Sequence, residues 1–327
     1  SLVMLAVVYF HSDSQHYNTT HQDDDVGIEA SASLRGAERK LRSSEAWGSA
    51  YSAEAAQGYG MAVVTASFGG RDHIDSLPIP PENGVKCILY TDRSVLNPNG
   101  WIVVLTPYHE MIPERWPWIP HEGRHAFGNI THPVVRSVMA AKFYKMNMYL
   151  LPEVAGIDVI MWADAAHFRF IAEATDRGSW RDILRGHSTD LVEYAEKTLD
   201  GRDMAIEVHR RSTLMSDFSL LRKRAVEVTN YTDAPQEMQD ALDHQFADGF
   251  RDVPGLYCHG ARFILNASSP RLQGALQAWW REVQLYTFRD QVSFPYIALQ
   301  QVQRHNFSCR LLRWRSLRNV IYHGHED

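Results

Sequence analysis

Asp164 is a carboxylate that follows a short apolar run, Val159–Trp162, almost at once. Such a run is too short for a globular helix and is typical of a strand buried on both faces. Open α/β sheets bind their ligands at the carboxyl ends of such strands, so Asp164 is a candidate ligand-binding or catalytic group. The alternative is a turn aspartate that caps the next segment, and these residues alone favour it.

A pair of lysines is the second candidate. Lys142 and Lys145 are three residues apart in a predicted helix, Val134–Leu151, which starts after a Thr131 cap and stops before Pro152. This spacing puts both ammonium groups on one face of the helix. The pair predicts a clamp for a phosphate-bearing ligand, and a solvated basic face is the alternative.

Four short apolar runs, each followed by polar residues, could position these groups. They are Met61–Thr65, Cys87–Tyr90, Trp101–Leu105 and Asp158–Trp162. Their length and composition predict neighbouring strands of a mostly parallel sheet with ligand loops at one edge. The first run leads into Gly69-Gly70, where the backbone can approach a ligand closely. No G-x-G-x-x-G follows any of the runs, which excludes a dinucleotide fingerprint.

The second half of the chain is predicted to be more helical. The long segment Tyr108–His132 reads as a loop and a candidate flap over the site. We expect helices at Ser179–Leu199, Pro235–Phe250 and Pro270–Leu285, a strand at Met204–His209, and short apolar runs at Gly255–Cys258, Arg262–Leu265 and Asn319–Tyr322.

Composition and charge limit the class of protein. The 327 residues are 45% hydrophobic and 22% charged, as in an ordinary globular protein, and the net charge of −6 without a basic stripe argues against nucleic acid as a partner. Residues 1–10 are too short to span a bilayer and are predicted to be the remnant of a signal-anchor. We expect a polar stalk at residues 11–57 and one α/β domain at residues 58–327, the layout of a type II membrane protein of the secretory pathway.

Glycosylation sequons support that compartment. Asn-x-Ser/Thr occurs at Asn18, Asn129, Asn230, Asn266 and Asn306, which predicts a luminal, N-glycosylated chain. The three cysteines say less about the compartment. Cys87 lies in an apolar run and is expected to be a buried thiol, while a disulfide between Cys258 and Cys309 stays open.

A family resemblance rests on several motifs in order along the chain. The most specific are Trp279–Glu282 and the following Arg289–Tyr296. Supporting motifs are Tyr90-Thr91-Asp92, Ala141–Lys145, Trp162-Ala163-Asp164 and Tyr322-His323. Over about Met61–His323 the chain resembles the glycosyltransferase-like family of plant mucilage-biosynthesis and bacterial surface-polysaccharide proteins, formerly a domain of unknown function.

The resemblance implies a GT-A-like, Rossmann-type domain with a mostly parallel central sheet flanked by helices. It implies a nucleotide-sugar donor, a glycan or glycoprotein acceptor, and Golgi placement, with the membrane reached only through an N-terminal anchor. Two positions depart from expectation. Enzymes of this fold usually bind a metal with Asp-x-Asp, but here Asp164 is followed by Ala165 and Ala166, and Lys142 stands where the family usually has Arg.

The chemistry of sugar transfer assigns roles to the candidates. A departing diphosphate needs positive charge, from a divalent metal or from a Lys/Arg pair. Asp164 with His323 would suit Mn²⁺, and Lys142 with Lys145 could act without a metal. The acceptor hydroxyl must lose a proton, and Asp290 is the candidate base. A surface histidine at His323 and an ion pair or helix cap at Asp290 are the alternatives.

The full set of candidates follows from these roles. Donor-binding candidates are Thr65, Phe68, Gly69, Asp92, Lys142 and Lys145, sugar- or acceptor-binding candidates are Arg289, Gln291 and Trp280, catalytic candidates are Asp290 and Asp164, and metal ligands are Asp164 and His323. Two other functions stay open: a ceramidase-like amide hydrolase that uses a metal-bound water, and a non-catalytic sugar-binding protein. No G-x-S-x-G supports the hydrolase.

Overall fold

The computed structural model describes residues 58–70, 74, 77, 80, 84–106, 133–165, 191–208, 213–216, 218, 235–252, 255, 257–286 and 289–313. All of them fall within one compact unit, Trp47–Asp327. The predicted anchor remnant, the stalk, the flap at Tyr108–His132 and the closing run Asn319–Tyr322 lie outside the described residues. Within the described part, no helix has the length and apolar character needed to cross a membrane.

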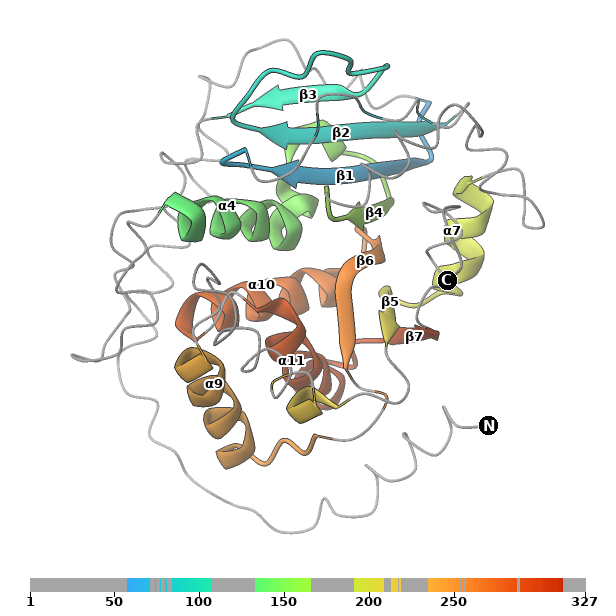
Figure 1. Cartoon of the computed structure of the whole chain (residues 1–327). Coiled ribbons are helices and arrows are strands. Elements are labelled where there is room, and N and C mark those ends of the chain that lie inside the picture. The colour runs from blue at the N-terminus through green and yellow to red at the C-terminus, as the bar shows by residue number, and fades with distance from the viewer. Residues whose placement is uncertain are drawn as a thin grey trace, which may run out of the picture. The chain divides into compact units, whose positions relative to one another are not determined.

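A seven-stranded mixed sheet forms the centre of the described fold (Figure 1). Its order is β3-β2-β1-β4-β6-β5-β7, and every pair is parallel except the two that β6 makes with β4 and β5. The strands are β1 Met61–Ser67, β2 Val85–Thr91, β3 Ile102–Leu105, β4 Val159–Ala163, β5 Met204–Val208, β6 Cys258–Asn266 and β7 Cys309–Arg313. The prediction of a mostly parallel sheet is confirmed, and the four predicted strands are neighbours.

The central strands are mostly apolar and are buried along their whole length because helices cover both faces of the sheet. Every residue of β1, β2 and β4 is buried. Strands buried on both faces cannot show the alternation of a half-exposed strand, so they read as continuous apolar runs. From β1 the chain builds outward to β2 and β3, then returns to β4 on the other side of β1. The carboxyl ends of β1 and β4 therefore flank a topological switch point.

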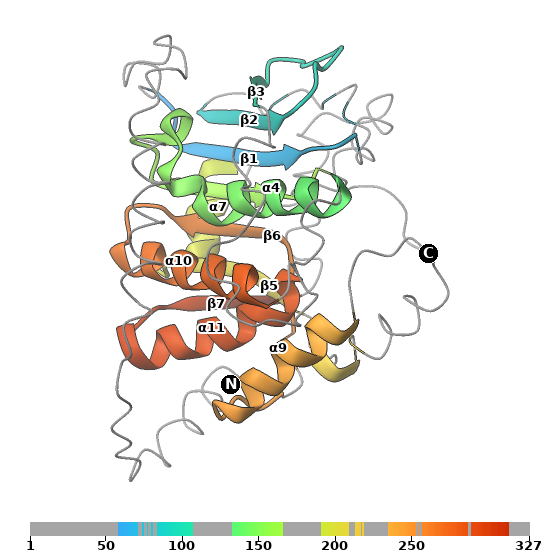
Figure 2. The same cartoon turned by 90° about the vertical axis from the view of Figure 1, so that its left-hand side faces the viewer.

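Helices form a layer on each face (Figure 2). α4 (Pro133–Asn147), α10 (Pro270–Leu285) and α11 (Asp290–His305) lie side by side on one face, and α7 (Leu191–Leu199) lies on the other. α9 (Pro235–Ala247) packs against α11. Two short 3-10 turns, Met148–Leu150 and Pro152–Val154, lead from α4 to β4.

Most predicted elements of the second half occur, with differences at their ends. The helix at Pro270–Leu285 has the predicted bounds, the predicted helix Pro235–Phe250 ends at Ala247, and the helix of the lysine pair ends in a 3-10 turn. The two apolar runs, Gly255–Cys258 and Arg262–Leu265, belong to one strand, β6. Two described elements were not predicted: α11, which contains Pro295, and β7.

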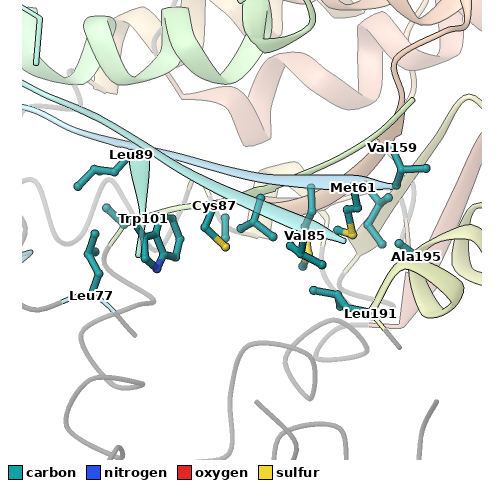
Figure 3. Packing of buried hydrophobic residues seen from close by; sticks show 14 of the residues in the cluster. Met61, Leu77, Val85, Cys87, Leu89, Trp101, Val159, Leu191 and Ala195 are labelled. Atoms are coloured by element: carbon teal, nitrogen blue, oxygen red, sulfur yellow. The ribbon is translucent and has the colours of Figure 1, made fainter. Parts of the chain in front are cut away.

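A hydrophobic core lies between the sheet and α7 (Figure 3). Met61, Val85, Cys87 and Val159 project from three strands towards Leu191 and Ala195 of α7. The opposite face of the sheet carries Trp162 and Phe263 under α4 and α10. The face of the sheet towards α7 is mostly apolar, although it also carries the buried ion pair between Arg262 and Glu207. Lys145 of α4 lies over the other face.

The cysteines are all free thiols. Cys87 is buried as predicted. Cys258 pairs in register with Val208, whereas Cys309 pairs with Met204, four residues away along β5. This spacing along the strand keeps the two thiols apart.

Candidate ligand-binding site

α4 brings the lysine pair to the carboxyl end of β4. It packs against β1 and α10, and Lys142 and Lys145 lie on the side that faces the sheet. The Lys145 ammonium lies 5.7 Å from the ring centroids of both Trp162 and Phe263, which are register partners in β4 and β6. Aromatic faces attract a cation, so this setting partly offsets the cost of burying it.

Two aspartates complete a group that we call the lysine–aspartate cluster: Lys142, Lys145, Asp164 and Asp290. The Asp290 Oδ2 atom lies 2.7 Å from the Lys142 Nζ atom and 2.5 Å from the Lys145 Nζ atom. The Lys145 Nζ atom also lies 3.3 Å from the Asp164 Oδ1 atom. The structure therefore brings Asp164 and both lysines together. Asp290 joins this group although it lies 145 residues after Lys145 in the sequence.

Asp290 is the first residue of α11, where the partial positive charge of the helix favours a carboxylate. Burial alone would raise the pKa of its carboxyl, but Lys142 and Lys145 hold that pKa well below its usual value. Only the Oδ2 atom has partners; among the described residues, none bonds the buried Oδ1 atom.

The two lysines differ in their electrostatic balance. Burial works to lower the pKa of Lys145, yet Asp164 and Asp290 outweigh it and raise the pKa above its usual value. Burial also lowers the pKa of Lys142, and there Asp290 offsets the effect only in part. The side chain of Lys142 is 16% exposed and that of Lys145 only 1%. Lys142 therefore has the more accessible side chain of the two.

Asp164 lies at the open side of the cluster, with 36% of its side chain exposed. The Trp162 Nε1 atom donates a hydrogen bond of 2.7 Å to the Asp164 Oδ1 atom. Trp162 was not predicted as a site residue. The signal was its place two residues before Asp164, because side chains two apart in a strand point to the same face.

These contacts do not suit a divalent cation at Asp164. Its Oδ1 atom already accepts from an indole N–H and from an ammonium group, and the ammonium would repel a bound cation. In the described ranges, no three His, Cys, Asp or Glu side chains form a group that could hold a metal. The second predicted ligand, His323, lies outside the described residues.

The loop after β1 meets the amino-terminal half of α4. The Gly69 N–H donates 3.0 Å to the Asp92 Oδ2 atom, which fixes this exposed aspartate at the carboxyl end of β2. Gly69 has a φ of 67°, and a Cβ there would lie 2.8 Å from the Cβ of Ser137 in α4. Glycine is therefore required both by the backbone and by the close approach. The amino end of α4 thus lies beside the ligand edge of the sheet.

The other donor-binding candidates are buried. Thr65 has no exposed surface, and its Oγ1 atom has no hydrogen-bond partner in the part of the chain that the structure describes. Phe68 is 2% exposed and stacks on Tyr144 at 5.5 Å between ring centroids, which indicates a packing role.

The sugar- and acceptor-binding candidates divide in the same way. Trp280 is 3% exposed and packs edge-to-face on Phe143 between α10 and α4, which indicates packing rather than a sugar platform. Arg289 and Gln291 flank Asp290 at the start of α11 and are half-buried. The buried Oε1 atom of Gln291 has no partner within the described ranges.

Comparisons with known proteins add little. No protein-family model matches the chain, and no curated protein matches it. Among solved structures, the chain is similar to the crystal structure of mouse xyloside xylosyltransferase 1 in its apo form, at 11% identity over 82% of this chain and 94% of that one. The TM-score is 0.33. A likeness of this size does not establish a shared fold.

Proposed function

We propose that the chain is a glycosyltransferase that moves a sugar from a nucleotide-sugar donor to a hydroxyl of a glycan or glycoprotein. The observation that carries the proposal is the lysine–aspartate cluster at the carboxyl edge of β4, next to the switch point of the sheet. Ligands of open α/β sheets bind at this place. The motif order described from the sequence supports the same assignment, since Trp162, Asp164, Lys145 and Asp290 all belong to those motifs.

Lys142 is the group that would meet the departing diphosphate. Its side chain is partly exposed, and Asp290 holds the ammonium group in a fixed position. Fixed positive charge that faces the place where negative charge develops stabilises a transition state. The amino end of α4, next to Gly69, adds the partial positive charge of a helix terminus. A bound diphosphate would also favour the charged form of Lys142, against the effect of burial.

Asp290 is better suited to hold the lysines than to act as the base predicted for it. A general base needs a pKa near the working pH, and the two ammonium groups keep the pKa of Asp290 far below that. Its side chain is also only 1% exposed. Asp164 is the carboxylate of the cluster that an acceptor or sugar hydroxyl could reach, and we assign the hydroxyl contact to it.

We also propose a luminal, N-glycosylated chain of the secretory pathway. Two of the sequon asparagines are described: Asn266 ends β6, and the exposed Asn306 caps α11 in a left-handed conformation with a φ of 53°. Both lie at the edge of the sheet opposite to the cluster, so glycans there would leave the ligand edge open. A mass decrease after enzymatic deglycosylation of the chain made in a eukaryotic secretory host would support the proposal, and an unchanged mass would contradict it.

The test of the activity is a panel of nucleotide sugars offered to the purified chain. Release of nucleoside diphosphate would be followed, and binding of nucleoside diphosphates would be measured by calorimetry. Lys142→Ala is expected to weaken that binding by about 10–100-fold, as for loss of a charge-assisted contact. The matched control is Lys197→Ala on α7, an exposed lysine that pairs with Glu193 on the other face of the sheet.

Three outcomes separate the candidate functions. Donor turnover that depends on Lys142 supports the transferase. Binding without turnover of any donor supports a sugar-binding protein instead. Absence of binding for the whole panel, or equal effects of Lys142→Ala and Lys197→Ala, overturns the proposal.

A further inference from the structure

Gly260 lies in β6 at a point where the pairing with β5 is irregular. Cys258 pairs with Val208 and Phe263 pairs with Ile206, so the register shifts around Gly260. Its φ lies outside the left-handed region, unlike the φ of Gly69. The backbone conformation therefore does not require glycine at this position. Glycine inside a strand often marks a bulge or a place where another group approaches closely.

The group that approaches is the carboxylate of Asp290. A Cβ on Gly260 would lie 2.9 Å from the Asp290 Oδ2 atom, 3.1 Å from its Cγ atom and 3.4 Å from its Oδ1 atom. Non-bonded carbon and oxygen atoms are not found that close, so the carboxylate rests against the bare Cα atom. The nearest atom, Oδ2, is the one that binds both Lys142 and Lys145.

The carboxylate of Asp290 could not move away from Gly260 without weakening its contacts with the two lysines. Asp290 has a short side chain, is 1% exposed, and is fixed at the first residue of α11. A shift of a few tenths of an ångström away from Gly260 moves the Oδ2 atom relative to both ammonium groups at once. Lys142, the partly exposed member of the cluster, would lose the contact that fixes its position.

We propose that Gly260 is a positioning residue: by lacking a side chain it seats Asp290, which in turn holds Lys142 ready for an anionic ligand. This inference rests on the proposed function in one respect, that Lys142 binds a diphosphate. The seating of Asp290 by Gly260 does not depend on it.

The test compares two glycine substitutions, Gly260→Ala and Gly274→Ala. Gly274 lies in α10, and the nearest atom to a Cβ there is the Gln301 Oε1 atom at 4.0 Å, so alanine fits. Affinity for inorganic pyrophosphate is measured by calorimetry well below the melting temperature. Gly260→Ala is expected to weaken binding by about tenfold or more, as loss of a well-placed charged contact does, whereas Gly274→Ala leaves it unchanged.

A second pair of variants tests whether the effect of Gly260→Ala comes from its contact with Asp290. Asp290→Ala removes the carboxylate, so adding Gly260→Ala to it should cause no further loss of melting temperature or of pyrophosphate affinity. The two changes are then strongly non-additive, as expected for residues in contact. If Gly260→Ala alone does not fold, the double variant and Asp290→Ala alone are still expected to share one melting temperature.

Equal pyrophosphate affinity of the two glycine variants overturns the positioning role. Additive losses of melting temperature overturn the contact itself. If the wild-type chain binds neither pyrophosphate nor any nucleoside diphosphate, the proposed function fails, and non-additivity alone then decides whether Gly260 seats Asp290.

Discussion

Asp203 and Asp290 are buried to the same degree, each 1% exposed, but their surroundings differ. Asp203 precedes β5 and accepts hydrogen bonds on both oxygens. The Ser269 Oγ atom lies 2.6 Å and the Arg271 Nη2 atom 3.0 Å from its Oδ1 atom, while the N and Oγ atoms of Ser308 both lie 2.7 Å from its Oδ2 atom. These donors come from the start of α10 and from the residue before β7.

Asp290 has two buried cations on one oxygen, whereas Asp203 has the neutral donors of Ser269 and Ser308 together with the half-exposed Arg271. Both ammonium groups bind its Oδ2 atom, and its Oδ1 atom has no partner in the described part of the chain. Burial would raise the pKa of either aspartate; hydrogen bonds from Ser269 and Ser308 lower it at Asp203, and two charges lower it at Asp290. A buried carboxylate whose two oxygens both accept hydrogen bonds, as at Asp203, fastens elements together. Asp290 is held by two cations and has one oxygen without a partner among the described residues, which fits the binding role proposed for the cluster.

The largest effect is expected for Asp290→Asn. An amide keeps the shape but cannot neutralise two buried ammonium groups, and removing one partner of a buried ion pair costs about 3–5 kcal/mol. Urea unfolding should show this loss in the free energy of unfolding, together with weaker pyrophosphate binding by the folded fraction. A loss below about 1 kcal/mol would mean that the charge of Asp290 is not what Lys142 and Lys145 require.

A third buried carboxylate, Glu282 on α10, tests the comparison through pH. It is 6% exposed and accepts 3.2 Å from the Gln245 Nε2 atom of α9. Burial raises the pKa of Glu282 to about 7, and the charge of Asp248 adds to this against the opposing effects of Gln245 and Arg281. The buried Oε1 atom of Gln245 has no partner among the described residues, and a protonated Glu282 could donate to it.

Since folding raises the pKa of Glu282, the folded chain binds this proton more tightly than the unfolded chain. Its contribution to the free energy of unfolding is complete below the unfolded pKa, near 4.5, and is lost as the pH rises to about 7. The loss should be about 3 kcal/mol. Unfolding curves across this range, compared with those of Glu282→Gln, measure it. Identical pH dependence of the two proteins would show that Glu282 titrates normally.

Asp203→Asn should cost less than Asp290→Asn. The Ser269 hydroxyl can rotate to accept from the new amide, and the amide oxygen can still accept from Ser308, so only part of the network is lost. We expect a decrease of about 1–2 kcal/mol in the free energy of unfolding, with pyrophosphate affinity unchanged. If Asp203→Asn proves more damaging than Asp290→Asn, the contrast between the two sets of partners is wrong.

The smallest effect is expected for Trp162→Phe. Phenylalanine keeps most of the ring under Lys145 and removes the 2.7 Å hydrogen bond to Asp164. The free energy of unfolding should fall by about 1 kcal/mol, and nucleoside diphosphate binding by a few-fold, because Asp164 loses one of the groups that hold it. Phe263→Leu, which removes the other ring near Lys145 without touching Asp164, is the matched control. Equal effects on binding would remove the role of the Trp162 hydrogen bond.

The sequence predicted the features of the fold and of the candidate site that depend on a local pattern of residues. β1, β2 and β4 are buried on both faces, so their apolar runs marked them, and the spacing of Lys142 and Lys145 placed both on one helix face. Contacts between residues that are distant in the sequence could not be predicted from the local sequence. Nothing near Asp290 indicates its lysine partners, and nothing near Gly260 indicates a carboxylate against its Cα atom.

The elements that were missed have physical reasons as well. Pro295 falls in the second turn of α11 and obscures the helical pattern, although its ring is accommodated there. β7 has Arg310 and Arg313 among its five residues and lies at the edge of the sheet, so it lacks the apolar run of a central strand. Trp280 and Phe68 were predicted to bind ligands, but tertiary packing covers both.

The distance along the chain between the members of the cluster has a consequence for the order of folding. Lys145 and Asp164 are separated by 19 residues, but Lys145 and Asp290 by 145. Closing the longer loop costs about 2 kcal/mol more chain entropy than closing the shorter one. A nascent chain that has made α4 and β4 therefore holds two lysines whose main counter-charge has not yet been synthesised. The cluster becomes neutral only when α11 docks and its Asp290 reaches the lysines of α4. It is therefore completed only after the chain has been synthesised as far as α11.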